Sequence, residues 1–242
     1  LVGGVKTKKF ETQISSMFGK KYGLFVNSGS SANLLALASL NLPHKSEIIT
    51  PALTFSTTIS PILQLGLIPN LIDAEIDTLN IDVSKIEKAI NKNTKALLIP
   101  NLMGNIPDWN KIKKIAKDKK IYVIEDSADT LGYSIKGKST GALSDIVTTS
   151  FYASHIITCG GIGGMVCTNN KSIYEKMKVI RELGGEYGDC LMAYVDFDSL
   201  SSEYSDDIAL FWGYQTPFNK ELINQNKDYK HKILYQHEHP SG

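Results

Sequence analysis

Cysteine is scarce in this sequence, and long apolar runs are missing. The three cysteines, Cys159, Cys167 and Cys190, show no CxxC spacing, so we expect neither a disulfide framework nor a zinc or other metal site. No apolar run approaches the ~20 residues that a helix needs to span a bilayer. The first residues, LVGGVKTKKFE, lack the apolar region and the cleavage site of a signal peptide. These absences predict a cytoplasmic protein without a membrane partner.

An excess of charge of one sign is also missing. The sequence has 26 lysines and arginines against 25 aspartates and glutamates, which gives a formal net charge of +1. Without a basic cluster, nucleic acid and anionic membranes are not expected as the main partner. The apolar share of 42% is ordinary for a globular protein, and 242 residues suffice for one large domain or two small ones.

Short apolar runs alternate with helical patterns along most of the chain. Runs that are apolar throughout, with helices between them, predict βαβ units around a mostly parallel sheet. The expected strands include residues 22–26, 46–50, 68–73, 95–100 and 121–126. Asp108 and Ser84 stand where helix N-caps belong, and Gly19 and Gly66 follow helical runs as C-caps.

A helical pattern over residues 171–183 is the last clear element. Beyond residue 184 the sequence has aromatic and acidic residues but no clear period. We therefore expect one α/β domain over residues 1–184 and a divergent tail over residues 185–242.

Residues 26–35, VNSGSSANLL, combine a strand end, a turn with glycine and a helix start. Gly29 and Ser30 would present backbone N–H groups at a helix N-terminus, which is a natural cradle for phosphate. The alternative is a simple capped helix, because serine is also a common N-cap. The segment lacks the lysine of a P-loop and the three glycines of a dinucleotide loop, which disfavours nucleoside triphosphates and NAD.

Two further strand ends carry candidate ligand groups. Asp126, with Glu125 beside it, ends the run 121–126, and Asp129 follows. A carboxylate there can pair with a protonated heterocyclic nitrogen, as in pyridoxal chemistry, or cap the next helix. Phe55 follows the run 46–50 and can stack on a flat cofactor ring or pack in the core.

Together, the ends of three successive strands offer a phosphate cradle, a ring face and a carboxylate. This is the set of groups that pyridoxal 5′-phosphate (PLP), or its amine form pyridoxamine 5′-phosphate (PMP), requires.

Four segments resemble the DegT/DnrJ/EryC1/StrS family of sugar aminotransferases, in the family's order and spacing. They are residues 26–40, 47–58, 123–132 and 149–168, and the similarity runs from about Gly3 to Leu183. The resemblance implies an α/β fold, the three-layer large domain of fold-type I PLP-dependent aminotransferases with a mostly parallel central sheet. It also implies a homodimer with the site at the subunit interface and a nucleotide-linked 4-keto sugar as substrate.

His155 stands at the position of the family's cofactor-binding lysine. The usual segment resembles SFxPxKN, but here residues 150–155 read SFYASH, and no lysine occurs between Lys138 and Lys171. This exchange is typical of the family's 3-dehydrase branch, which removes the C3 hydroxyl of CDP- or GDP-linked 4-keto-6-deoxy sugars in deoxysugar and lipopolysaccharide biosynthesis. Without the lysine, the cofactor must be held noncovalently, most usefully as PMP. Imidazole exchanges protons near neutral pH, so His155 is the candidate catalytic base.

The resemblance also assigns cofactor-binding roles. The matching residues are Gly29, Ser30, Phe55, Asp126, Asp129 and Ser150. The amides of Gly29 and Ser30 would hold the phosphate with help from the Ser150 hydroxyl. Phe55 would stack on the ring, Asp126 would pair with the pyridine nitrogen, and Asp129 would lie near the 3-hydroxyl.

Two residues near the N-terminus match a segment that lies beside the sugar nucleotide in the family. Lys6 and Thr7 are therefore candidate substrate-binding residues. A reductase would complete the dehydrase pathway as a separate partner.

The sequence departs from the family in three places. Cys190 in YGDC resembles the first ligand of the iron–sulfur cluster of some branch members, but Cys159 and Cys167 lie in the wrong region. Because such a site needs four thiolates, no [2Fe–2S] cluster is expected. The glycine run CGGIGG is one residue longer than the family's. Family members are also longer, so the chain is expected to be truncated and to lack most of a small C-terminal domain.

Three functions therefore stay open. The first is PMP-dependent 3-dehydration, and the second is ordinary sugar transamination with another lysine recruited to the cofactor. The third is a noncatalytic remnant that binds the cofactor or a sister subunit without turnover. A covalent lysine adduct would favour the second, and cofactor binding without dehydration would favour the third.

Overall fold

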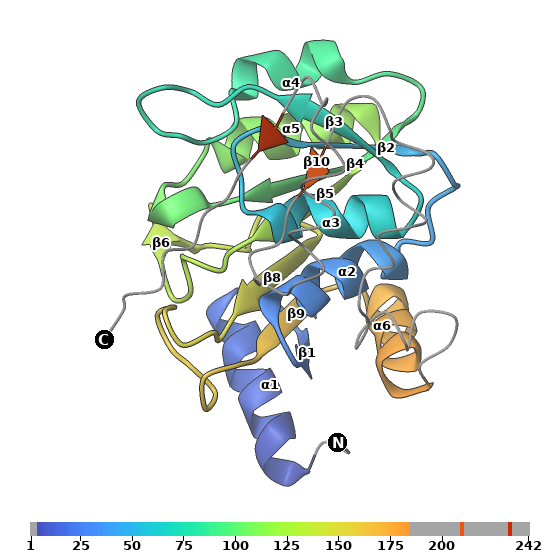
Figure 1. Ribbon diagram of the computed structural model, residues 1–242. Coiled ribbons are helices and arrows are strands. Elements are labelled where there is room, and N and C mark those ends of the chain that lie inside the picture. Colours follow the sequence, from blue (N-terminus) through green and yellow to red (C-terminus); the bar gives the residue numbers. More distant parts are fainter. Residues whose placement is uncertain (1–3, 184–208, 211–231, 234–242) are drawn as a thin grey trace. The chain divides into compact units, whose positions relative to one another are not determined.

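The computed structural model describes residues 4–183, 209–210 and 232–233 (Figure 1). Its main sheet has seven strands in the order β1-β9-β8-β5-β4-β2-β3. These are β1 (Tyr22–Val26), β2 (Glu47–Pro51), β3 (Ile68–Ile72), β4 (Thr94–Pro100), β5 (Tyr122–Asp126), β8 (Ile146–Ser150) and β9 (Gly164–Thr168). Only β9 runs antiparallel to its neighbours, β1 and β8. The carboxyl ends of the other strands therefore meet at one edge of the sheet.

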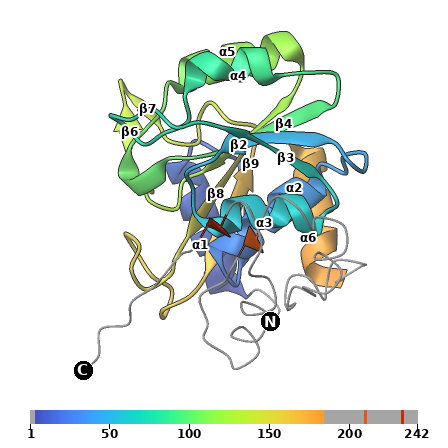
Figure 2. The same ribbon diagram turned by 45° about the horizontal axis from the view of Figure 1, so that its top comes forward.

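Helices cover both faces of this sheet (Figures 1 and 2). They are α1 (Val5–Met17), α2 (Gly29–Ser39), α3 (Ser56–Gln64), α4 (Val83–Ala89), α5 (Trp109–Lys119) and α6 (Lys171–Leu183), with a 3-10 turn η1 (Leu102–Gly104). Helices α2, α3 and α6 bury residues such as Leu35, Ile62 and Met177 against one face. Helices α4 and α5 bury Ile86 and Ile112 against the other. The predicted three-layer α/β arrangement with a mostly parallel sheet is confirmed.

Two short strand pairs complete the described elements. Strands β6 (Ser134–Ile135) and β7 (Lys138–Ser139) form a hairpin. The chain divides into two compact units, Leu1–Ala193 and Tyr194–Gly242. In the second unit, β10 (Ala209–Leu210) pairs in parallel with β11 (Lys232–Ile233). The predicted divergent tail, residues 185–242, otherwise lies outside the described residues, as does Cys190.

Of the predicted helix caps, Asp108 is confirmed and Ser84 is wrong, while Gly19 and Gly66 stand one residue beyond the C-cap residues of α1 and α3. The Asp108 side chain caps α5 by accepting a hydrogen bond from the Lys111 N–H at 3.0 Å. Ser84 is not an N-cap, because Asp82 precedes it and caps α4 instead. The Asp82 carboxylate accepts bonds from both the backbone N–H and the hydroxyl of Ser84, at 3.0 and 2.6 Å. An ionised acceptor two residues upstream thus takes the position that the serine was predicted to hold.

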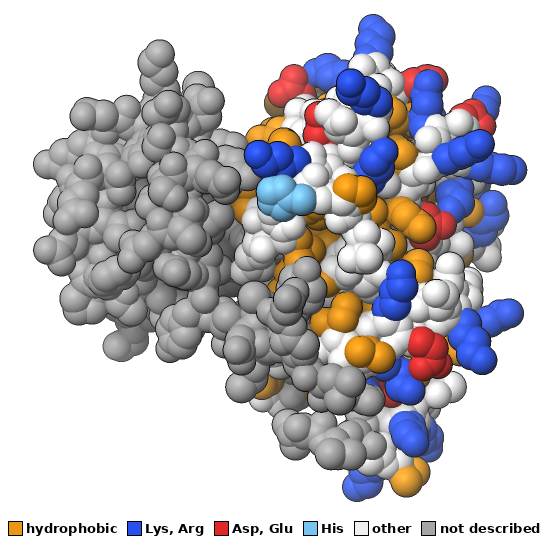
Figure 3. Space-filling model, turned by 90° about the vertical axis from the view of Figure 1, so that its right-hand side faces the viewer, with side chains coloured by type: hydrophobic (Ala, Val, Ile, Leu, Met, Phe, Trp, Pro, Cys, Tyr) orange, Lys and Arg blue, Asp and Glu red, His pale blue; other side chains and the backbone are white. Residues whose placement is uncertain are grey.

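The surface of the described residues mixes charged and apolar groups. Figure 3 shows lysine and arginine side chains scattered over one side of the molecule among apolar and acidic ones. No helix in the described part of the chain is long and apolar enough to cross a membrane.

Candidate functional site

The first turn of α2 and the end of β8 lie against each other. Ser28 is the N-cap of α2, and its Oγ accepts a hydrogen bond from the Ser31 N–H at 3.1 Å. The first N–H groups of a helix have no partner within the helix, so those of Gly29 and Ser30 are available to a ligand. A Cβ added to Gly29 would lie 2.7 Å from the Cβ of Ser150. The predicted phosphate cradle therefore brings Gly29, Ser30 and the Ser150 hydroxyl together.

The start of β9 closes the same cradle from its other side. A Cβ on Gly164 would lie 2.2 Å from the Ser28 carbonyl oxygen and 2.7 Å from the Gly29 nitrogen. These contacts are with backbone, which cannot rotate away as a flexible side chain can. The glycine at the end of the run CGGIGG is thus required by the close approach of two chain segments.

Replacing Gly164 by alanine is expected to destabilise the protein and open the cradle. Forcing a methyl group into packed backbone costs about 1–3 kcal/mol, or roughly 2–4 °C in the unfolding midpoint for each kcal/mol. Gly29→Ala should act in the same direction through Ser150. The matched control is Gly4→Ala, where an added Cβ would meet nothing within 4 Å. Thermal unfolding checks this, and a Gly164→Ala midpoint equal to that of Gly4→Ala would contradict it.

Asp126 lies at the end of β5 with its half-buried carboxylate directed toward α2 and α3. Its Oδ2 accepts a hydrogen bond from Asn33 Nδ2 at 2.8 Å, and its Oδ1 accepts one from the Ala128 N–H at 3.2 Å. Burial raises the pKa of Asp126, while the bonds from Asn33 and Ala128 lower it. Within the described ranges, no lysine or arginine pairs with this carboxylate. A half-buried carboxylate whose direct hydrogen-bond donors are all neutral suits a cationic ligand group, such as a protonated pyridine nitrogen.

His155 and Asp129 form a pair beside Asp126. The Nδ1 atom of His155 lies 3.2 Å from Oδ1 of Asp129, and Asp129 Oδ2 accepts a hydrogen bond from the Met103 N–H at 3.1 Å. This pairing leaves Nε2 of His155 as the nitrogen that can exchange a proton with a ligand. Asp129 follows Asp126 by three residues, and its negative charge adds to the effect of burial in raising the pKa of Asp126.

Phe55 marks a third part of the same sheet edge. It precedes the first turn of α3 and is 45% exposed, so it is not the core residue that its sequence context allowed. Three residues on, Thr58 Oγ1 lies 3.5 Å from Asp126 Oδ2 and accepts a hydrogen bond from Thr54 at 3.0 Å. The loop that carries the exposed ring is thereby connected to the carboxylate.

The strands that carry these groups are not successive, contrary to the sequence prediction. Gly29 follows β1, Phe55 follows β2, and Asp126 ends β5, and none of these strands is a neighbour of another in the sheet. Their carboxyl ends still lie at one edge of the sheet. Strand β9 is antiparallel to both β1 and β8, so β1 runs in the same direction as β8 and the strands beyond it. The three groups therefore lie at the same edge of the sheet, at strands that are not adjacent to one another.

Lys6 and Thr7 are not joined to the rest of the candidate site. Both lie in the first turn of α1, where Lys6 is exposed. In the part of the chain that the structure describes, neither makes a hydrogen bond or ion pair with the other predicted site residues. Helix α1 reaches the site region through Phe10, whose ring packs on Phe151 with centroids 5.1 Å apart. A role in substrate binding stays a prediction.

Two buried residues of the site were missed by sequence reasoning. Asn33 is 2% exposed and bonds to Asp126, and Thr148 is 1% exposed and donates its hydroxyl hydrogen to Asn33 Oδ1 at 2.6 Å. Glu125 instead faces the opposite side of the sheet, where it accepts bonds from Asn101, Ser127 and the Gly141 N–H. Burial raises the pKa of Glu125. The two carboxylates of β5 thus serve different faces.

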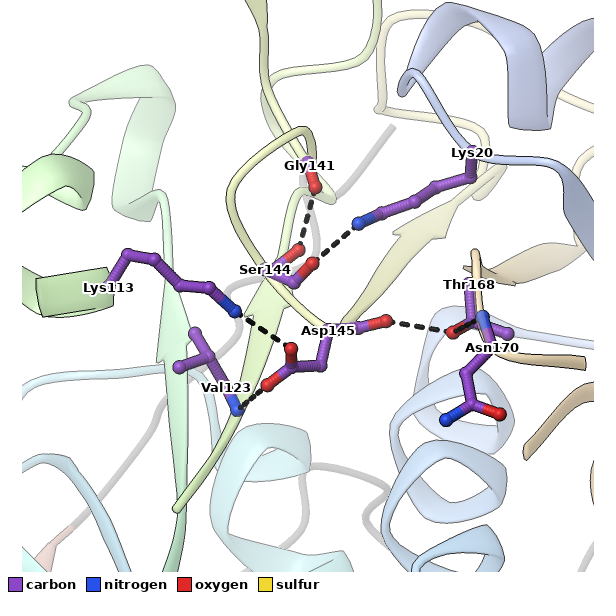
Figure 4. A network of polar contacts seen from close by, with 8 residues as sticks. All are labelled: Lys20, Lys113, Val123, Gly141, Ser144, Asp145, Thr168 and Asn170. Carbon is purple, nitrogen blue, oxygen red and sulfur yellow. Dashed lines mark hydrogen bonds and ion pairs between the residues drawn. The ribbon is translucent and has the colours of Figure 1, made fainter. Parts of the chain in front are cut away.

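A second polar cluster lies at the amino ends of β5 and β8, away from the carboxyl ends that carry the candidate site (Figure 4). It lines a cavity of about 300 Å³. Lys113 pairs with Asp145 at 2.8 Å, and Asp145 also accepts a bond from the Val123 N–H at 2.9 Å. Lys20 donates to the Ser144 carbonyl at 2.5 Å, and burial lowers its pKa to about 8. These contacts fix the start of β8 against α5 and β5.

One family of proteins matches most of this chain. Residues 1–194 match the model of the DegT/DnrJ/EryC1/StrS aminotransferase family. The chain belongs to this family. The family resemblance of the four sequence segments is thereby confirmed.

Two curated relatives are named as a sugar-nucleotide 3-dehydratase and as a lipopolysaccharide biosynthesis protein. GDP-4-keto-6-deoxy-D-mannose 3-dehydratase of Yersinia pseudotuberculosis is 38% identical over an alignment of 188 positions that covers 75% of this chain and 47% of the relative. Lipopolysaccharide biosynthesis protein RfbH of Salmonella typhimurium is 34% identical over an alignment of 236 positions that covers 94% of this chain and 50% of the relative. The second alignment therefore extends beyond residue 184, into the segment that showed no clear pattern.

A solved structure supports the same relationship. The E. coli GDP-4-keto-6-deoxy-D-mannose-3-dehydratase with bound hydrated PLP is 38% identical, with a TM-score of 0.70 over 74% of this chain and 47% of that one. The chain spans about half the length of the curated relatives that it matches.

Proposed function

We propose that the chain holds PMP noncovalently and removes the C3 hydroxyl of a nucleotide-linked 4-keto-6-deoxyhexose, a step of deoxysugar and lipopolysaccharide biosynthesis. The single observation that carries the proposal is the pair His155–Asp129 at 3.2 Å, beside Asp126, where the family's aminotransferases carry a lysine. The names of the similar 3-dehydratases support the same reaction class. The proposal places the protein in the cytoplasm.

The residues around the cradle fit the parts of this cofactor. The N–H groups of Gly29 and Ser30 would bind the phosphate at the positive end of the α2 dipole, with the Ser150 hydroxyl as a further donor. The exposed ring of Phe55 would stack on the pyridine ring. Asp126 would hold the pyridine nitrogen in its protonated form, and the cation would in turn relieve the cost of burying that carboxylate.

The chemistry divides between the cofactor and His155. When bound, PMP would supply an amine that condenses with the C4 ketone, and loss of a C4′ proton from the conjugate would supply the electron pair that expels the C3 hydroxyl. His155 would remove that C4′ proton through Nε2, while Asp129 holds the imidazole ring in place through Nδ1. The protonated imidazole would then give its proton to the departing hydroxyl, which leaves as water. Because imidazole forms no stable linkage with the cofactor aldehyde, the site is not diverted to ordinary transamination.

The test is the product made from GDP- or CDP-4-keto-6-deoxyhexose. The purified chain is incubated with PMP and the sugar nucleotide, and the product is analysed by mass spectrometry and NMR. We expect loss of the C3 oxygen and full recovery of free cofactor from the denatured protein.

Two other outcomes would identify the competing functions. A 4-amino sugar that keeps its C3 hydroxyl, with a borohydride-trapped lysine adduct, would indicate a transaminase. Cofactor binding without any product would indicate a noncatalytic remnant.

The proposal extends to the partners. A homodimer with the site at the subunit interface and a reductase that acts on the dehydration product both follow from the family resemblance, as does substrate binding by Lys6 and Thr7. The oligomeric state in solution, measured by light scattering, tests the first of these.

A further inference from the structure

We propose that Asn33 is a positioning residue for the cofactor and that Thr148 sets its orientation, so that the chain Thr148–Asn33–Asp126 keeps the Asp126 carboxylate charged and directed toward the pyridine nitrogen. This inference rests on the proposed function, because it concerns the same site. It assigns to two buried residues a role that their sequence positions do not indicate.

The hydrogen bonds of the series Thr148–Asn33–Asp126 fix the orientation of the Asn33 amide. An amide side chain can present either its oxygen or its NH₂ group to a neighbour. Thr148 donates to Asn33 Oδ1 at 2.6 Å, which fixes the oxygen on that side and turns Nδ2 toward Asp126 Oδ2 at 2.8 Å. A secondary contact from Nδ2 to the Thr57 carbonyl at 3.4 Å is compatible with the same orientation. Without the Thr148 hydroxyl, the amide could turn its oxygen to the carboxylate, which would repel it.

The burial of Asn33 and Thr148 makes these hydrogen bonds matter for the charge of Asp126. Asn33 and Thr148 are nearly inaccessible to water, so no solvent molecule can replace either donor. Asp126 has no lysine or arginine partner among the residues that the structure describes, and its direct hydrogen bonds come from neutral donors. Loss of the Asn33 donor would raise the pKa of Asp126 further, because the remaining effect of burial favours the protonated acid.

The charge of Asp126 should determine how tightly the protein binds PMP. A protonated Asp126 cannot stabilise a pyridinium, so PMP should be held less tightly whenever Asp126 takes up a proton. As the pH falls, the affinity should therefore decline, and the decline should begin at a higher pH when Asn33 or Thr148 is altered. A residue with a purely structural role would change the stability but not this pH dependence.

The experiment uses Asn33→Leu, Thr148→Val and the double variant, with PMP as the probe. The matched control is Thr149→Val, since Thr149 is as buried as Thr148 but faces the other side of β8 and donates to the Ser127 carbonyl at 3.1 Å. The dissociation constant of PMP is measured from its absorbance between pH 5 and 9, after circular dichroism has shown that each variant is folded. In the unliganded proteins, the Asp126 carboxyl is titrated by carbon-13 NMR.

We expect Asn33→Leu and Thr148→Val to weaken PMP binding about tenfold, the value of one hydrogen bond to a charged group. The carboxyl titration should move to higher pH in both, and Thr149→Val should change neither measurement. The double variant should equal Asn33→Leu, because Thr148 acts through Asn33.

Two results would overturn the inference. Unaltered affinity and carboxyl titration in a folded Asn33→Leu protein would overturn it while leaving the proposed function intact. If the unaltered chain does not bind PMP at all, the proposed function and this inference both fail, and the two outcomes are thus distinguishable.

Discussion

Replacing His155 by asparagine is expected to slow C3 dehydration by about 10²–10⁴-fold, the usual contribution of a general base. Asparagine keeps a polar side chain near Asp129 but cannot accept the proton from C4′. The affinity for PMP should change little, because His155 contacts neither the phosphate cradle nor Asp126 directly. Single-turnover rates with PMP-loaded protein check the first expectation, and equilibrium binding checks the second. A variant that dehydrates at the unaltered rate would remove His155 from the mechanism.

The lysine variant tests the same position in the opposite direction. His155→Lys restores the residue type of the family's aminotransferases, so it should gain a covalent bond to PLP that borohydride traps, together with some transaminase activity. Tyr152→Lys is a matched control, because Tyr152 is in the same loop but 57% exposed. Equal trapping at both positions would show that any lysine in the loop suffices and would weaken the assignment of the position.

Replacing Asp126 by asparagine is expected to weaken PMP binding about 10- to 100-fold, because a charge-assisted hydrogen bond to the pyridine nitrogen is lost. The same substitution should stabilise the unliganded protein at higher pH, because it removes a carboxyl group whose ionisation there destabilises the folded state. Burial raises the pKa of Asp126, so the folded state holds a proton that the unfolded state has already released. The free energy of unfolding therefore falls as the pH rises from the usual pKa of aspartate through the raised value, and this loss should disappear in the variant.

Glu125→Gln is the matched control for this prediction. Glu125 precedes Asp126 on β5, is 1% exposed and has a pKa that burial also raises, but it faces the other side of the sheet. Both variants should alter the pH dependence of thermal unfolding, whereas only Asp126→Asn should alter PMP affinity. Equal loss of affinity in the two proteins would contradict the pairing of Asp126 with the cofactor.

The sheet and the helices of the domain were predictable because their signals are local. The run 22–26 is apolar throughout and the run 121–126 is apolar up to Ile124, and the strands β1 and β5 lie there. Strand β8 was not singled out, since Thr148, Thr149 and Ser150 give its second half a polar sequence although all three are buried. Burial of hydroxyl groups depends on partners from other elements, which no local pattern contains.

Some residues of the candidate site could also be predicted from local sequence, and others could not. Gly29, Asp126 and His155 could be identified because the chemistry of each residue type at a strand end, or in a family segment, is informative by itself. Asn33 and Thr148 could not, because they are 115 positions apart and meet only when α2 packs on β8. The opposite directions of Glu125 and Asp126 were accessible from the alternation of side chains along a strand.

The most direct test of the central claim follows the hydrogen at C4′ of the cofactor. PMP carrying deuterium at C4′ is bound to the protein, a 4-keto-6-deoxyhexose nucleotide is added, and the isotope content of the cofactor is measured by mass spectrometry. If His155 is the base, one of the two deuterium atoms of doubly labelled PMP is lost to solvent only when sugar is present, and both are retained in His155→Asn. Loss at the same rate in the variant, or retention of both deuterium atoms by the unaltered protein while sugar is consumed, would contradict the assignment.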